Sequence, residues 1–125
     1  MRLIKNEKKF RQRLYWGDLD FDGLTFTDID AYMNYFEKIL IFIEVKQSGK
    51  KLGFAQKRAF ENIIKNLNIP SVYILAWHED VSADQNILLK DCFVCEYFYK
   101  NKWFNGNKQY IEPFVKKIIN SVKSS

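Results

Sequence analysis

The stretch Ile39-Leu40-Ile41-Phe42-Ile43-Glu44-Val45-Lys46 decides the fold of this chain. Five apolar residues in a row, three of them β-branched isoleucine, precede the first charged side chain. Such a run is typical of a strand that other elements cover on both faces, so we expect a central strand of a sheet. Glu44 and Lys46 follow with period-two spacing, which places both side chains on the same face where the strand ends.

Hydrophobic periodicity predicts the elements on either side of this strand. Residues of high β-propensity predict a strand over 24–35, and a turn over 34–38 leads from it into 39–46. Apolar residues at helical spacing predict a helix over 55–67, with an expected buried face of Ala55, Ala59, Phe60, Ile63, Ile64 and Leu67. The other expected elements are a helix over 3–15, a strand over 71–77, a strand over 92–99, a short strand over 102–104 and a helix over 111–122. This order predicts an α/β fold in which a mixed central β-sheet is flanked by helices.

Length and composition narrow the class of protein. A chain of 125 residues, 47% hydrophobic and 17% aromatic, is expected to form a single domain over 1–125 and not to be disordered. The net charge of +5 is compatible with a polyanionic partner. No apolar stretch is long enough for a bilayer span or a signal peptide, and two cysteines do not make a disulfide framework. We therefore expect a soluble, cytoplasmic protein without a membrane partner.

Acidic residues on the expected hairpin point to metal chemistry. Asp28 and Asp30 share one face of the strand before the turn, and the hairpin can bring them close to Glu44. Two or three carboxylates buried together are costly unless a cation neutralises them, and a divalent metal with oxygen ligands does so. The ammonium group of Lys46 can then hold a water or stabilise negative charge on a phosphate. This combination suits the hydrolysis of a phosphodiester.

The same residues resemble the PD-(D/E)xK nuclease superfamily, and in particular its small phage-type and restriction-like members. Asp30 is followed fourteen residues later by Glu44-Val45-Lys46, in the order strand, turn, strand and helix. The resemblance implies a restriction-endonuclease-like fold and a nuclease that depends on Mg2+ or Mn2+, with DNA as the expected substrate. It further implies that Asp30, Glu44 and the carbonyl of Val45 bind the metal. Lys46 would orient the attacking water and stabilise the transition state.

Three further residues take roles that the resemblance implies. Gln56, in the expected helix, would position Lys46 or a phosphate, and Glu7, in the first expected helix, would assist the metal or the water. Asp28 would be a supporting metal ligand or a surface residue. No proline precedes the key aspartate, which departs from the namesake motif. The apolar residue before Asp30 favours it as the primary ligand, although the choice between the two aspartates stays open.

Basic residues flank the expected site. Lys50, Lys51, Lys57 and Arg58 lie on the loop and helix after Lys46, where they are candidates for contacts with nucleic-acid phosphates. A solvated helix face explains each of them equally well. A chain of this size has little room for a separate specificity domain, which leaves a homodimer or a larger complex open.

Other motifs support weaker alternatives. Asp18-Leu19-Asp20-Phe21-Asp22-Gly23 matches the opening of an EF-hand calcium loop, but Ile29 occupies the twelfth position, where a bidentate glutamate is needed. The Cys92-Phe93-Val94-Cys95 motif would put its sulfurs on opposite faces of a strand, so we expect structural thiols. His78 follows a strand and is not needed for the chemistry above.

The alternative function is a catalytically inactive nucleic-acid- or protein-binding module of the same fold.

Overall fold

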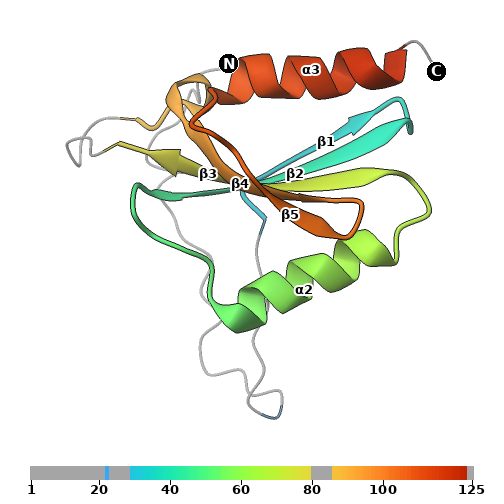
Figure 1. Ribbon diagram of the computed structural model, residues 1–125, viewed down its shortest axis with the longest axis horizontal. Coiled ribbons are helices and arrows are strands. Elements are labelled where there is room, and N and C mark those ends of the chain that lie inside the picture. The colour runs from blue at the N-terminus through green and yellow to red at the C-terminus, as the bar shows by residue number, and fades with distance from the viewer. Residues whose placement is uncertain (1–21, 23–28, 80–85, 124–125) are drawn as a thin grey trace, which may run out of the picture.

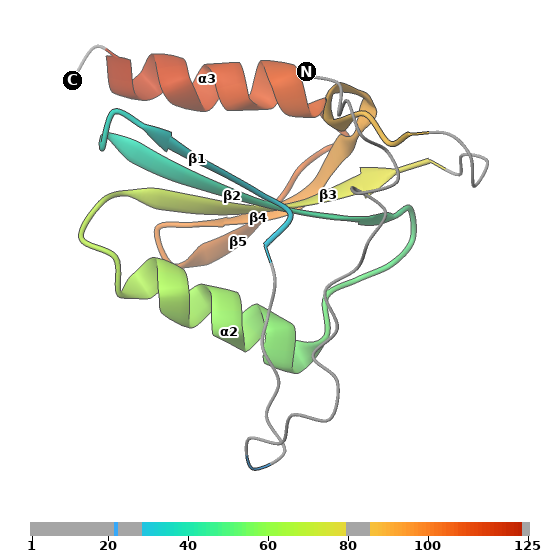
Figure 2. The same cartoon turned by 180° about the vertical axis from the view of Figure 1, so that it is seen from behind.

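The computed structural model describes residues 22, 29–79 and 86–123. Within these ranges a β-sheet lies between two α-helices, with α2 on one face and α3 on the other (Figure 1 and Figure 2). None of the helices in these ranges is both long and apolar enough to span a membrane. In chain order the elements are β1 (Ala31–Tyr35), β2 (Ile39–Gln47), α2 (Phe54–Lys65), β3 (Ser71–His78), the 3-10 turn η1 (Leu89–Asp91), β4 (Phe93–Tyr99), β5 (Lys102–Asn105) and α3 (Ile111–Lys123).

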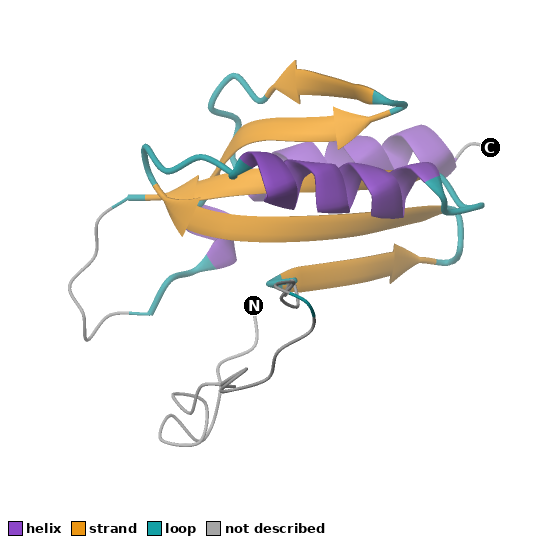
Figure 3. Cartoon of the chain, turned by 90° about the horizontal axis from the view of Figure 1, so that it is seen from below, coloured by secondary structure: helices purple, strands orange, loops and turns teal. Residues whose placement is uncertain are grey.

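The sheet is mixed. Its five strands lie in the order β1-β2-β3-β4-β5, so strands that are neighbours in sequence are also neighbours in space. β2 and β3 run parallel because α2 connects them, whereas the other three neighbouring pairs are antiparallel. Figure 3 shows one helix along the strands in front of the sheet and the other behind it. The expected α/β class with a mixed sheet between helices is thereby confirmed.

Strand β2 separates two halves of the core because its residues alternate between the faces of the sheet. The three isoleucines of its apolar run lie in the cluster beneath α3, and its leucine and phenylalanine lie in the cluster beneath α2. All five side chains are at most 8% exposed, as a strand covered on both faces requires. Glu44 and Lys46 continue the alternation of Leu40 and Phe42, and so project from the face that α2 covers.

The turn between β1 and β2 has two residues in the left-handed region. Phe36 and Glu37 have φ values of 47° and 60°, and the Lys38 amide donates to the Tyr35 carbonyl at 2.9 Å. Residues 36–38 lie between the register partners Tyr35 and Ile39, and the two positive φ values suit the twist of the flanking strands. The side chain of Asn34 accepts a hydrogen bond from the Glu37 amide at 2.7 Å. The turn fixes the register of the hairpin and thus the positions of residues at its open end.

The first strand and the first described helix differ in extent from the expected ones. The strand expected over 24–35 begins only at Ala31, with residues 24–28 outside the described ranges. The helix expected over 55–67 runs over 54–65, and Ile63 and Leu67 are 39% and 37% exposed, not buried. The buried residues of α2 are Phe60 and Ile64. They lie four residues apart on one narrow face of the helix, and this face contacts the sheet. The helix expected over 3–15 lies outside the described residues.

Candidate active site

The end of β2 and the residue before β1 meet at the open end of the hairpin. Ala31 pairs with Ile43 across the antiparallel ladder, and the same register leads from Asp30 to Glu44. The side chain of Asp30 turns toward β2, where its Oδ2 accepts a hydrogen bond from the Val45 amide at 2.7 Å. The Asp30 carboxylate is therefore held against the backbone of the motif that contains the predicted glutamate and lysine.

The carbonyl of Val45 faces the same edge as the Asp30 carboxylate. In an extended strand the N–H and C=O of one residue point to one side, and successive residues alternate between the two sides. The Leu40 amide donates to the Pro70 carbonyl at 2.9 Å, on the β3 side of the strand. Even-numbered residues of β2 consequently face β3, and odd-numbered residues face β1. The Val45 carbonyl thus lies on the side from which Asp30 approaches.

Glu44 and Lys46 lie on the face of β2 that α2 covers. Glu44 is only 7% exposed, and Lys46 is half-buried. Their register partners on β3 are Leu75 and Trp77, respectively. A buried carboxylate is stable as an anion only where hydrogen-bond donors or a cation compensate its charge. The fold therefore places Glu44 where its carboxylate is largely shielded from solvent.

Gln56 approaches the same face from α2. It is four residues before Phe60 and eight before Ile64, the two buried residues of that helix. Residues at this spacing share one face of a helix, so the half-buried Gln56 extends the sheet-facing stripe toward its N-terminal end. That end of α2 lies at the end of the sheet where β2 and β3 terminate (Figure 1). The structure thus brings Asp30, Glu44, Lys46 and Gln56 to one end of the sheet.

The oxygen atoms at this end suit a divalent cation such as Mg2+ or Mn2+. They comprise the Asp30 carboxylate, the Glu44 carboxylate and the Val45 carbonyl. Hard cations prefer oxygen ligands, and Mg2+ is commonly held by one or two carboxylates while it keeps several waters. Within residues 22, 29–79 and 86–123, no group of three or more acidic, histidine or cysteine side chains could hold a metal ion.

Two of the expected site residues lie outside the described part of the chain. These are Glu7, the expected helper of the metal or water, and Asp28, the expected supporting ligand. Asp30 is the candidate aspartate whose contact with β2 can be described. Of the expected calcium-loop aspartates, only Asp22 is described, with a φ of 57°.

The four basic residues expected to contact nucleic acid fall into two groups. Three of them are exposed to solvent, on the loop after β2 and on the first turns of α2: Lys50, Lys51 and Arg58. The fourth, Lys57, is half-buried.

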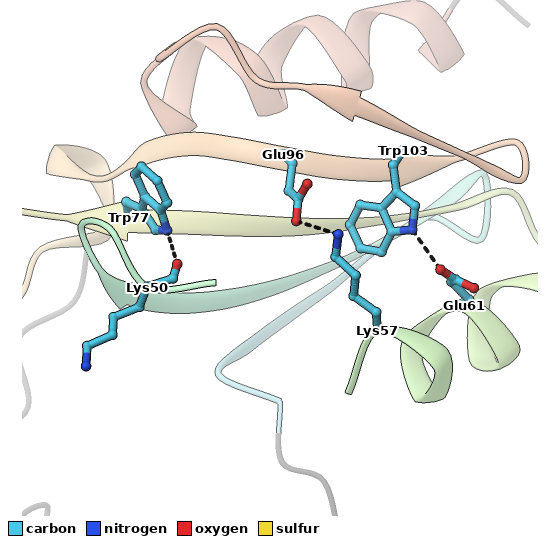
Figure 4. A network of polar contacts seen from close by, with 6 residues as sticks. All are labelled: Lys50, Lys57, Glu61, Trp77, Glu96 and Trp103. Carbon is cyan, nitrogen blue, oxygen red and sulfur yellow. Dashed lines mark hydrogen bonds and ion pairs between the residues drawn. The ribbon is translucent and has the colours of Figure 1, made fainter. Parts of the chain in front are cut away.

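Lys57 contacts the β4–β5 hairpin. Its Nζ lies 3.2 Å from Glu96 Oε1 and 4.6 Å from the centre of the Trp103 ring (Figure 4). One helical turn further along α2, Glu61 accepts a hydrogen bond from Trp103 Nε1 at 2.8 Å. These contacts attach α2 to the sheet, and they favour a structural role for Lys57 over the expected phosphate contact.

Trp77 anchors the loop that follows the candidate site. Its Nε1 donates to the Lys50 carbonyl at 2.6 Å (Figure 4). Because Trp77 is the register partner of Lys46, this hydrogen bond holds the loop beside the predicted catalytic lysine. At the other end of the loop, Leu52 is 7% exposed and lies in the cluster beneath α2. The loop is thus fixed at both ends.

The two cysteines behave as structural thiols. Cys92 lies in the cluster beneath α3, whereas Cys95 contacts the cluster beneath α2, so they face opposite sides of the sheet as expected. Burial raises the pKa of both thiols. The positive charges of Lys51 and Lys57 oppose the rise in the pKa of Cys95. A raised pKa disfavours the reactive thiolate.

Comparison with protein-family models, with curated proteins and with solved structures finds no match for this chain. The candidate site therefore rests on the geometry of this chain alone. Sequence reasoning did not identify Trp77 as a residue of the site. Its contact with the loop depends on the parallel register of β2 and β3, for which the sequence carries no local signal.

Proposed function

We propose that this chain is a metal-dependent nuclease of the restriction-endonuclease-like type, which hydrolyses phosphodiester bonds in DNA. The observation that supports it most strongly is the 2.7 Å hydrogen bond from the Val45 amide to Asp30. This contact brings a carboxylate from before β1 to the point in β2 where Glu44 and Lys46 project. An acid that is distant in the sequence thereby lies beside the strand that carries the second acid and the lysine.

The order of the elements supports the proposal as well. The predicted motif lies on a hairpin whose second strand is covered on both faces, and a helix that carries Gln56 follows it. This is the strand, turn, strand and helix order on which the resemblance to PD-(D/E)xK nucleases is based. The net charge of +5 favours a polyanionic substrate.

The site residues take distinct chemical roles in this proposal. Asp30, Glu44 and the Val45 carbonyl hold Mg2+ or Mn2+, which supplies Lewis acidity and offsets negative charge on the phosphate. The ammonium group of Lys46 donates hydrogen bonds, so it orients the attacking water through the water's oxygen and stabilises charge that develops on the phosphate. The amide of Gln56 can accept from Lys46 or donate to a phosphate oxygen.

A cleavage assay tests the proposal. The protein is incubated with supercoiled plasmid, linear duplex and single-stranded DNA in Mg2+, in Mn2+ and in EDTA. We expect cleavage with either metal and none in EDTA. Glu44→Gln keeps the size of the side chain but removes its charge and replaces one acceptor oxygen by an NH2 donor, and should lower the rate by at least about 100-fold. Cleavage that persists in EDTA, or at the wild-type rate in Glu44→Gln, would contradict the proposal.

The alternative function predicts a different result in the same assay. An inactive binding module binds DNA but cleaves none of the three substrates with either metal. Its thermal stability should also be unchanged by Mg2+ or Mn2+, because a protein that binds no metal gains no stability from it. That pair of results would favour the binding module over the nuclease.

A further inference from the structure

An exposed aromatic side chain lies at the N-terminal end of α2, beside the candidate active site. Phe54 is the first residue of that helix and is 78% exposed. Aromatic side chains gain much free energy from burial, so a phenylalanine held in water forgoes a large stabilisation. The guanidinium carbon of Arg58, one helical turn later, lies 5.8 Å from the centre of the Phe54 ring.

The chain around Phe54 is anchored, so the exposure of its side chain follows from the fold. Two residues before it, Leu52 is 7% exposed in the cluster beneath α2. The Lys50 carbonyl accepts the 2.6 Å hydrogen bond from Trp77, and the Lys57 amide donates to the Gly53 carbonyl at 3.0 Å. The ring is therefore exposed to solvent on a segment that these contacts attach to the sheet.

The segment from the end of β2 to the middle of α2 carries charged side chains of one sign only. From Lys46 to Phe60 the sequence contains five basic residues and no acidic residue. Lys57 is paired with Glu96, which leaves the exposed basic side chains to face a ligand. Figure 4 shows the side chain of Lys50 extending away from Trp77 and from the sheet. An anionic ligand is the complement of this surface.

From this juxtaposition we infer that Phe54 stacks on an unpaired nucleobase while Lys50, Lys51 and Arg58 contact the neighbouring backbone phosphates. Every base has a π-face, and aromatic side chains flanked by cations are the usual support for single strands. A base inside a duplex is already stacked on its neighbours and cannot lie on a protein ring. The ligand is therefore a single-stranded segment of nucleic acid. The choice of nucleic acid as the ligand rests on the proposed function. The inference narrows that substrate class to nucleic acids with an unpaired nucleotide beside the active site.

Binding of a labelled single-stranded DNA oligonucleotide, measured by fluorescence anisotropy in EDTA, tests the inference without cleavage. Phe54→Ala should weaken binding by about tenfold or more, because alanine has no ring on which a base can stack. Phe54→Tyr keeps an aromatic ring and should retain the wild-type affinity. Phe36→Ala is the matched control, since Phe36 is 79% exposed but lies in the turn at the other end of β2. It should bind as the wild type does.

The salt dependence of binding tests the cationic part of the surface. Lys50→Ala should reduce the slope of log affinity against log salt by about 0.7, the value for one lost phosphate contact on a single strand. Wild-type affinity in Phe54→Ala would overturn the inference. So would a wild-type protein that does not bind the oligonucleotide, or that binds a duplex of the same sequence more tightly. A protein that binds the single strand through Phe54 but cleaves nothing contradicts the proposed nuclease function and leaves this inference standing.

Discussion

The Asp30 carboxylate accepts a hydrogen bond from the Val45 amide at 2.7 Å, across the open end of the β1–β2 hairpin. The bond joins the residue before an edge strand to an interior strand whose apolar run is covered on both faces of the sheet. It also places the carboxylate beside the Val45 carbonyl, because both backbone groups of that residue face β1. In the proposed function the hydrogen bond positions the acid before metal or substrate arrives, and such preorganisation is a main source of catalysis.

Substitution of Asp30 separates its charge from its hydrogen bond. Asp30→Asn keeps an oxygen that can accept from the Val45 amide, so we expect a nearly unchanged free energy of unfolding but a loss of at least about 100-fold in cleavage rate. Asp30→Ala should lose the same activity and also about 1 kcal/mol of stability. Urea denaturation and a cleavage assay measure the two effects. Wild-type cleavage by Asp30→Asn would exclude a role for the charge.

The hydrogen bond from Trp77 to the Lys50 carbonyl should control the mobility of the loop after β2. Trp77→Phe keeps an aromatic ring but removes the donor, so amide hydrogen exchange over residues 48–53 should accelerate by about threefold to tenfold. Trp103→Phe is the matched control, because it removes a similar indole donor from Glu61 and not from the loop. Equal exchange in the loop of the two variants would show that Trp77 does not anchor it.

Lys57 should stabilise the protein without contributing to the salt dependence of DNA binding. Lys57→Met keeps an apolar stem beside Trp103 and removes the ion pair with Glu96. The two side chains are 33% and 24% exposed, so solvent screens the pair and we expect a loss of only about 0.5 kcal/mol. In titrations at several salt concentrations the variant should have the wild-type slope, unlike Lys50→Ala. A lowered slope would assign Lys57 to the phosphate-binding surface after all.

Gly106 should tolerate no side chain. A Cβ added there would lie 2.6 Å from the carbonyl carbon of Val94, and the Gly106 amide already donates to the Cys95 carbonyl at 2.9 Å. The backbone must shift to relieve the overlap, so Gly106→Ala should cost about 2 kcal/mol in the free energy of unfolding. Gly53→Ala meets no atom within 4 Å and should be near neutral. Equal stability of the two variants in thermal or urea denaturation would contradict this packing.

Local patterns of the sequence predict the central features of the fold. The apolar run before Glu44 predicts a strand covered on both faces, since only such a strand buries consecutive residues. The alternation at its end predicts that Glu44 and Lys46 share a face, as they do. These predictions succeed because they depend on backbone periodicity and not on distant partners.

Features that depend on distant partners could not be predicted. Lys50 and Lys57 are both basic residues close to the motif in the sequence, so the sequence does not distinguish their roles. The ion pair of Lys57 with Glu96 depends on the position of β4 beneath α2. The position of Ile63 in the helical pattern predicts that it is buried. In the structure Phe60 and Ile64 are the residues of α2 that are buried against the sheet, and Ile63 is exposed. In each case the side chain's environment is set by the tertiary arrangement of strands.

Single-turnover cleavage by Lys46→Ala tests the central claim most directly. Lys46 lies at the half-buried end of β2, so its truncation should leave the fold intact, as circular dichroism can verify. The matched control is Lys38→Ala, which removes an exposed lysine from the turn at the opposite end of the same strand. With Mg2+ present, we predict that Lys46→Ala loses at least about 100-fold in rate and that Lys38→Ala cleaves as the wild type does. Cleavage by a folded Lys46→Ala protein at the wild-type rate would contradict the account.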